Sequence, residues 1–288
     1  MYGPVIGLIA YAGKPGARQL VEAVTAELSR RDVPYLLERE TAHLLGDEGG
    51  FDIPALAEQC GMIMILGGDG SILRVLRKMH GVLKPILGIN FGSLGFLTCV
   101  SASGYPRAID SIVKETYVIS ERVLLQVEIE RDGRIIDTKR ALNDVVVSRG
   151  GSSKLVKVSV HIDDEMLTEY NADGLIVATA TGSTAYSLAS GGPILMPETD
   201  VFVVTPICPH VLTNRSVIVS ENSVITLRPT RKEQYLSLSA DGDAPFIMEY
   251  GDTLRISKFP QPLPLVMLPE LPFSEVLRQK LKWTGTNI

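Results

Sequence analysis

Short apolar segments alternate with segments of helical periodicity over the first hundred residues, and this alternation restricts the fold more than any other feature of the chain. Residues 5–10, 62–66 and 85–90 have the length and apolar character of buried strands. Between them, residues 20–28 and 71–79 place apolar side chains three and four positions apart, which is typical of helices on a sheet. The succession predicts an α/β domain with a mainly parallel sheet.

The pattern changes near residue 100. Leu125, Val127 and Ile129 alternate with polar residues, and further short strands separated by turn residues follow to about residue 256. These strands predict an all-β, sandwich-like body. We therefore expect an α/β domain over residues 1–99 and a β-rich domain over residues 100–263. The proline-flanked tail, residues 264–288, could return to complete the first domain.

Composition limits the partners of the chain. The 288 residues include 28 Lys and Arg against 33 Asp and Glu, a formal net charge of −5, so the global charge does not favour a nucleic-acid partner. Three widely spaced cysteines form no disulfide or metal pattern, which fits a reducing compartment. The first apolar segment has no basic leader, and no apolar run has membrane-spanning length. We expect a cytoplasmic protein that does not bind membranes.

A glycine-rich turn follows the strand at residues 62–66 and leads directly into a helix. Its sequence is Gly67-Gly68-Asp69-Gly70. Because it follows a predicted parallel strand, we expect it at the carboxyl end of that strand, where such sheets bind ligands. Bare backbone at Gly68 and Gly70 would let phosphate approach the helix N-terminus. Asp69 could merely cap the helix. Because a carboxylate repels phosphate unless it accepts a proton or holds a metal ion, we favour a catalytic role.

Two further clusters carry glycine, hydroxyl and aromatic residues. Residues 88–97 form either a domain hinge or a second wall of the same cleft, with Phe91 as a flat apolar face. Residues 181–193 gather hydroxyls and small residues around Tyr186 at a predicted helix start, shortly after the Asn-Ala-Asp-Gly sequence at 171–174. This combination suits a base, a ribose and phosphate oxygens better than it suits an ordinary polar loop.

Together these motifs resemble the NAD kinase family over nearly the whole chain, from residue 5 to about residue 270. The matching segments occur in the family's order: 67–71, 88–90 with 95–97, 142–144, 171–174, 181–193, 206–210 and 241–242. Lipid kinases and phosphofructokinases share versions of the Gly-Gly-Asp-Gly turn alone. Its combination with Thr-Gly-Ser-Thr-Ala-Tyr-Ser and Asn-Ala-Asp-Gly is highly specific.

The resemblance implies transfer of the γ-phosphate of ATP to the 2′-hydroxyl of the adenosine ribose of NAD, giving NADP, with Asp69 as the general base. It implies that Asn143 and Asp144 contact the adenosine half and that Asp173 reaches the other nucleoside, across a subunit boundary. The remaining residues that it places at the substrates are Gly68, Gly70, Arg74, Lys154, Thr184, Ala185, Tyr186, Ser187, Leu188, Ala189 and His210, and we add Phe91 from its place in segment 88–97. Within this set, Lys154 and Arg74 would lie near phosphates.

The resemblance also implies a divalent ion, most simply Mg²⁺ carried by ATP, and a homodimer or homotetramer formed through the β-rich domains; it does not identify the metal ligands. Polyphosphate as donor and NADH as acceptor stay open. So do a lipid or sugar kinase and a non-catalytic dinucleotide sensor, although residues 181–187 oppose the first and an intact Asp69 opposes the second. The chain departs from the family at Asp144, where many members have Glu, and at Asp243, where Gln is frequent.

Overall fold

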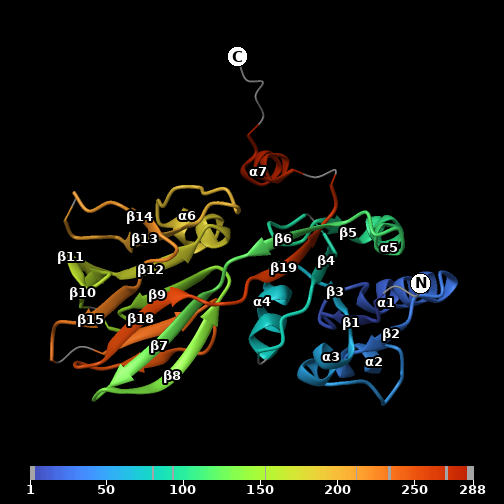
Figure 1. Cartoon of the computed structure of the whole chain (residues 1–288), viewed down its shortest axis with the longest axis horizontal. Coiled ribbons are helices and arrows are strands. Elements are labelled where there is room, and N and C mark those ends of the chain that lie inside the picture. The colour runs from blue at the N-terminus through green and yellow to red at the C-terminus, as the bar shows by residue number, and fades with distance from the viewer. Residues whose placement is uncertain are drawn as a thin grey trace. The chain divides into compact units, whose positions relative to one another are not determined.

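The computed structural model describes residues 4–79, 81–92, 94–152, 154–211, 213–232, 235–269 and 272–283. The chain forms two compact units, Met1–Glu121 with Leu263–Ile288 and Arg122–Pro262 (Figure 1). The sequence pattern placed the first boundary after residue 99, whereas α5 (Tyr105–Val113) belongs to the first unit. Its apolar side chains Ala108, Ile109 and Ile112 pack into the core of that unit, a long-range contact that local periodicity does not reveal.

The first unit contains a seven-stranded sheet in the order β2-β1-β3-β4-β19-β6, with β5 paired to β4. The pairs that β1, β3 and β4 make with their neighbours are parallel. The strands are β1 (Ile6–Ala10), β2 (Tyr35–Leu37), β3 (Met62–Leu66), β4 (Ile86–Asn90), β5 (Val100–Ser101), β6 (Val118–Arg122) and β19 (Leu263–Met267). The predicted α/β domain with a mainly parallel sheet is confirmed.

Helices occupy most of the connections within this unit, and one helix follows its last strand. They are α1 (Ala17–Arg30), α2 (Arg39–Leu44), α3 (Ile53–Gln59), α4 (Asp69–Lys78), α5, the short 3₁₀ helix η1 (Ala102–Gly104) and the C-terminal α7 (Phe273–Leu281). Every residue of β1 and β3 is buried, which explains why these strands appear in the sequence as unbroken apolar runs. Among the described residues, no helix is both long enough and apolar enough to cross a membrane.

The second unit consists of two six-stranded sheets, ordered β11-β10-β15-β18-β7-β8 and β14-β13-β12-β9-β16-β17. Its strands are β7 (Leu125–Arg131), β8 (Arg134–Ala141), β9 (Asp144–Ser148), β10 (Val156–Ile162), β11 (Glu165–Ala172), β12 (Gly174–Thr179), β13 (Val201–Ile207), β14 (Val217–Ser220), β15 (Ile225–Pro229), β16 (Leu236–Ala240), β17 (Phe246–Met248) and β18 (Thr253–Lys258). The 3₁₀ helix η2 (Thr181–Thr184) and α6 (Tyr186–Ala189) follow β12.

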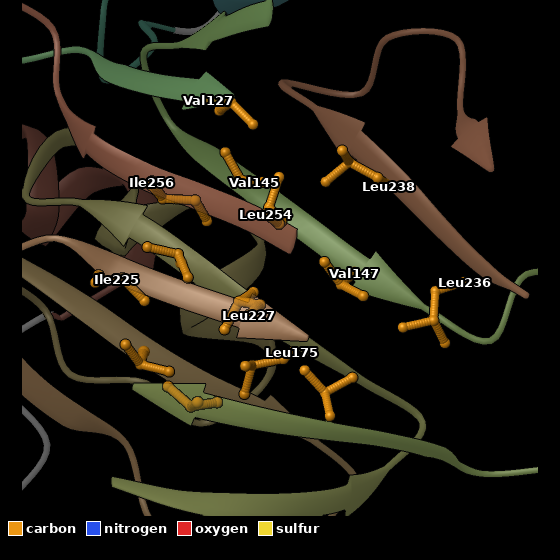
Figure 2. Close-up of a cluster of buried hydrophobic side chains, with 14 of the residues drawn as sticks. Val127, Val145, Val147, Leu175, Ile225, Leu227, Leu236, Leu238, Leu254 and Ile256 are labelled. Atoms are coloured by element: carbon orange, nitrogen blue, oxygen red, sulfur yellow. The ribbon is translucent and has the colours of Figure 1, made fainter. Parts of the chain in front are cut away.

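One hydrophobic core lies between these two sheets. Val127, Ile225 and Ile256 of the first sheet belong to the same buried cluster as Val147 and Leu238 of the second (Figure 2). Each strand directs alternate side chains toward this core, so buried and half-buried residues alternate along most of β7. The predicted β-sandwich-like body is confirmed, and its period-two pattern has this physical cause.

Candidate active site

The glycine turn lies at the carboxyl end of β3, and Asp69 is the first residue of α4. A Cβ atom on Gly67 would overlap the side chain of Ser71, so the turn can close only with glycine at this position. Gly70 is different, because it is exposed and no atom lies within 4 Å of where its Cβ would be. Packing within the unit therefore does not explain the missing side chain of Gly70, and the space beside it is open to a ligand.

The carboxylate of Asp69 is held by the segment that follows β4. Its Oδ2 accepts a hydrogen bond from the Phe96 amide at 2.8 Å, and its Oδ1 accepts from the amides of Leu97 and Thr98 at 3.1 and 3.2 Å. The Thr98 hydroxyl also lies 3.2 Å from Oδ1. These bonds orient the carboxylate while leaving Oδ2 with a single partner among the described residues.

Gly95 permits this arrangement, because a Cβ atom there would overlap Oδ1 of Asp69. Segment 88–97 therefore contributes to the surroundings of Asp69, which agrees with its interpretation as a wall of the same site. Within this segment, Ser93 lies outside the described residues. Phe91 directly follows β4 and is half-buried against the core of its unit, so only part of its ring is available as an apolar face.

Arg74 lies about a turn and a half further along α4 than Asp69 does. Its guanidinium carbon stands 5.5 Å from the centre of the Tyr11 ring, and Nη1 is 3.7 Å from a carboxylate oxygen of Glu40. Tyr11 directly follows β1, the strand beside β3, so this cation lies at the same edge of the sheet as Asp69. The Nε atom of Arg74 is buried without a hydrogen-bond partner in the described structure. Arg74 is thus a restrained, partly neutralised cation.

In the second unit, Asp241 fixes the backbone that presents Asn143 and Asp144. Its carboxylate accepts bonds from the amides of Leu142, Asn143 and Asp144 at 2.7, 2.8 and 3.1 Å. Asp241 has a φ of +49°, in the left-handed region, and its amide returns a bond to the Asp144 carbonyl. The half-buried side chain of Asn143 is thereby held directly before β9.

The Asp144 carboxyl is only 6% exposed and lies close to a second carboxylate. Burial and, to a smaller extent, the charge of Asp241 raise the pKa of Asp144 to about 6, while the Tyr186 amide opposes the shift by donating a hydrogen bond to it. The group therefore changes protonation near pH 6. Perturbed carboxylates of this kind gather at functional sites.

Sequence reasoning missed Thr179, which joins this segment to η2. Its buried hydroxyl donates to the Leu142 carbonyl at 2.6 Å and accepts from the Gly182 amide at 3.0 Å. Gly182 must be glycine, because a Cβ atom would overlap the backbone of Asn143. The signal was present in the sequence: Thr179 is a polar residue that ends an otherwise apolar run.

Several predicted ligand hydroxyls between residues 181 and 190 are engaged within the protein. Ser187 is fully buried and shares a hydrogen bond of 3.0 Å with Thr205, and Thr184 donates to the Thr181 carbonyl at 3.2 Å. Tyr186 by contrast is 46% exposed. Ala185 and Leu188 are half-buried and Ala189 is exposed, so the segment presents mainly small and aromatic surface.

The predicted residues of the second unit separate into two groups. Asp144 pairs with Ala178 at one end of the β9–β12 ladder, whereas Ser148 pairs with Gly174 at the other. Four residue steps along a strand correspond to about 14 Å. Asn143, Asp144 and residues 184–189 therefore lie at one end of this sheet.

Asp173, Lys154 and His210 belong to the opposite end. Arg149, which directly follows β9, lies with its Nε 3.4 Å from Asp173. The exposed His210 joins this end through its amide, which donates to the Asn171 carbonyl, and Lys154 follows in the exposed segment after Arg149. The structure thus does not bring all predicted substrate residues of this unit into one site.

Asp243 has a structural role instead of the contact expected of the family's glutamine. Its Oδ2 accepts from Lys139 at 2.6 Å, and its Oδ1 accepts from the Ala240 amide at 2.8 Å. The side chain is consequently occupied in closing the turn after β16.

Comparisons with known proteins agree with this architecture. A model of the ATP-NAD kinase N-terminal domain matches residues 6–117, and a model of the ATP-NAD kinase C-terminal domain matches residues 142–268. An NAD kinase of Symbiobacterium thermophilum is 38% identical over 283 residues, covering 98% of this chain and 100% of that protein. An NAD kinase of Geotalea daltonii is 41% identical over 268 residues, covering 93% of each.

Two solved structures share the fold at 24% sequence identity. The yeast NADH kinase complexed with NADH has a TM-score of 0.90 and covers 99% of this chain and 90% of its own. An NAD kinase from Archaeoglobus fulgidus in complex with ATP has a TM-score of 0.75 and covers 98% of this chain and 100% of its own.

The chain thus shares its two-unit fold with solved two-domain kinases. The domain models and the identity along almost the whole chain specify it further: the chain belongs to the NAD kinase family and is an NAD kinase enzyme.

Proposed function

We propose that the enzyme transfers the γ-phosphate of ATP to the 2′-hydroxyl of the adenosine ribose of NAD, giving NADP, with Asp69 as the general base. The observation that supports this proposal most directly is the fixed Asp69 carboxylate at the carboxyl end of β3. Phosphoryl transfer depends chiefly on positioning and charge stabilisation. A carboxylate held in one orientation can accept the proton of an attacking hydroxyl without first reorganising.

The phosphate groups of the donor would approach the exposed backbone of Gly70 and the neighbouring Gly68. The N-terminus of α4 offers amide groups there that favour negative charge. Arg74 lies on the same helix and adds a cation restrained by Tyr11 and Glu40. Because Glu40 neutralises part of this charge, we assign Arg74 to positioning phosphate, with the main neutralisation coming from the metal ion.

A divalent ion, Mg²⁺ in our proposal, would be bound chiefly by the phosphates of ATP. The described residues contain no cluster of three His, Cys, Asp or Glu side chains that could hold a cation. Binding through the phosphates of ATP suits Mg²⁺, which keeps several waters and commonly takes one or two carboxylates together with substrate phosphates. When bound, the ion would offset the repulsion between Asp69 and phosphate.

The adenosine half of NAD would bind where Asn143, Asp144 and residues 184–189 meet. The Asn143 amide can donate to and accept from the base or ribose. The exposed face of Tyr186 can pack against the flat base. Ser187, whose hydroxyl is bonded to Thr205, would support this surface from below rather than contact the ligand.

The second nucleoside would be contacted by Asp173 and His210. Since they lie at the other end of the β9–β12 ladder from Asn143, we propose that they serve a dinucleotide bound to a neighbouring copy in a homodimer or homotetramer. Lys154 lies at this end as well. A cytoplasmic location remains our proposal for the compartment.

The experiment that tests the function uses the purified full chain with NAD, ATP and Mg²⁺. Formation of NADP is followed with an NADP-specific dehydrogenase, and ³¹P NMR of the product locates the new phosphate on the ribose 2′-oxygen. Parallel reactions with inorganic polyphosphate as donor and with NADH as acceptor define the preferred substrates. A folded protein that forms no NADP, or that phosphorylates a diacylglycerol instead, would overturn the proposal.

A further inference from the structure

A pocket of about 610 Å³ in the β-rich unit is lined by four basic side chains, and no described lining residue carries a carboxyl group. The cations are Arg149 and Lys154 from the segment after β9, and Arg231 and Lys232 from the segment before β16. Its size is that of a small-molecule site. In a chain with a formal net charge of −5, this concentration of positive charge is notable because like charges repel.

The pocket is separate from the surface assigned to adenosine. Ser148 and Ser237 are partners in the β9–β16 ladder, and the basic segments extend from that end of it. Val145 and Ala240 mark the other end, beside Asp144 and Asp241. The offset of about 10 Å between these registers, three residue steps, places the pocket beyond direct reach of the Asn143 side chain.

Neighbouring carboxylates neutralise this charge only in part. Arg149 lies 3.4 Å from Asp173. Hydrogen bonds from Thr230 and Lys157 lower the pKa of the nearby Glu169, and the charge of Arg231 contributes less, so this carboxylate is already bonded to other groups. Within the described parts of the chain, no carboxylate forms an ion pair with Lys154 or with Lys232. Among the described residues, the four cations of the pocket thus outnumber the carboxylates beside them, and a bound anion would neutralise the difference.

The rest of the lining suits a phosphorylated ligand with an aromatic group. Gly150 and Gly151 leave their backbone bare, and no atom lies within 4 Å of where the Cβ of Gly151 would be. Tyr235 is 66% exposed and offers a flat face. Leu236 is fully buried in the sandwich core, where Figure 2 shows it near Val147, and gives the pocket a fixed floor.

We propose that this pocket is a second anion site, which binds a chain of linked phosphates carried by a nucleotide or present as inorganic polyphosphate. The cations contact the phosphate oxygens, and Lys154 makes its predicted phosphate contact here and not at the acceptor. The lining of the pocket alone defines this site, and the site takes no part in the proposed reaction.

Isothermal titration calorimetry of the full chain with sodium tripolyphosphate tests the site. In the double variant Arg231→Gln/Lys232→Gln, one binding site per chain is expected to weaken about tenfold or more, because two charge-assisted contacts are lost. The matched control is Arg228→Gln/Arg255→Gln, which removes the same charge from β15 and β18 of the same unit, outside the pocket lining. The control should bind as the wild type does.

Neither pair of substitutions touches the residues assigned to the reaction, so both variants are expected to form NADP at the wild-type rate. Equal tripolyphosphate binding by the two variants, or no binding by the wild type, would overturn the site. Absence of NADP formation by the wild type would instead overturn only the proposed function.

Two further titrations identify the source of the phosphates. If the ligand is a nucleotide, Mg²⁺-free ATP binds this site more tightly than tripolyphosphate does, and Tyr235→Ala abolishes the difference. If it is inorganic polyphosphate, the two probes bind alike and Tyr235→Ala has no effect. Lys154→Gln completes the assignment: it should weaken tripolyphosphate binding without raising the KM for NAD, and the reverse result would return Lys154 to the acceptor site.

Discussion

Replacement of Asp144 by asparagine is predicted to stabilise the protein above neutral pH. Burial and the charge of Asp241 raise the pKa of Asp144 from 3.8 to about 6, so the folded state binds its proton more tightly than the unfolded state does. Stability contributed by this proton is therefore complete below about pH 4 and is lost as pH rises through 6. At 1.36 kcal/mol per unit, the shift corresponds to about 3 kcal/mol of lost stability at pH 8.

The isosteric Asp144→Asn change removes this loss, because its amide is neutral at every pH. Its oxygen can still accept from the Tyr186 amide, and its NH₂ group can face Asp241. Urea unfolding at pH 8 should show a gain of up to about 3 kcal/mol that shrinks toward pH 4.5. The KM for NAD should rise in the same variant, because Asp144 is assigned to the acceptor.

The control for this prediction is Asp243→Asn. Asp243 is paired with Lys139 and bonded to the Ala240 amide, so the same substitution there should lower stability at pH 8. A loss of stability in Asp144→Asn at pH 8, or a gain that does not change with pH, would refute the electrostatic account of Asp144.

Two further predictions concern the hydroxyls that shape the sites. Thr98→Val leaves the Gly95 amide without its acceptor and Asp69 without one donor, so the free energy of unfolding should fall by about 1–3 kcal/mol and kcat should fall too. The control Thr98→Ser keeps the hydroxyl and should retain both the stability and kcat. Equal behaviour of the two variants in melting and steady-state assays would contradict the role of the hydroxyl. Thr179→Val breaks the link between Leu142 and Gly182, so it should raise the KM for NAD with little change in kcat, and an unchanged KM would argue against that link.

The sequence predicted those features of the fold that depend on local pattern. Unbroken apolar runs correspond to the buried parallel strands β1 and β3, and period-two alternation corresponds to strands of the sandwich such as β7. The assignment of α5 to the first unit depends on which core its apolar side chains enter, and one helix's periodicity does not contain that information.

For the candidate site, the sequence predicted the motifs but not their internal contacts. It singled out Asp69 and segment 88–97 separately. The hydrogen bonds from this segment to the Asp69 carboxylate join the ends of two strands, and local sequence pattern does not reveal such a contact. It assigned Asn143 to the adenosine half and Asp173 to the other nucleoside, and strand register places these residues at opposite ends of one ladder, a separation that the motifs alone do not show. It counted Ser187 as a ligand, whereas its hydroxyl is bonded to Thr205, far along the chain.

The proposed reaction requires Asp69 to accept the proton of the attacking hydroxyl, and a comparison of kcat and NAD affinity between the wild type and Asp69→Asn tests this role. Asparagine can keep the bonds to Oδ1 but cannot act as a base, so NADP formation should fall by about 10²–10⁴-fold. The Kd for NAD should stay within a few-fold of the wild-type value. Near-normal turnover in Asp69→Asn would contradict the account and leave Asp69 as a structural anchor of the turn.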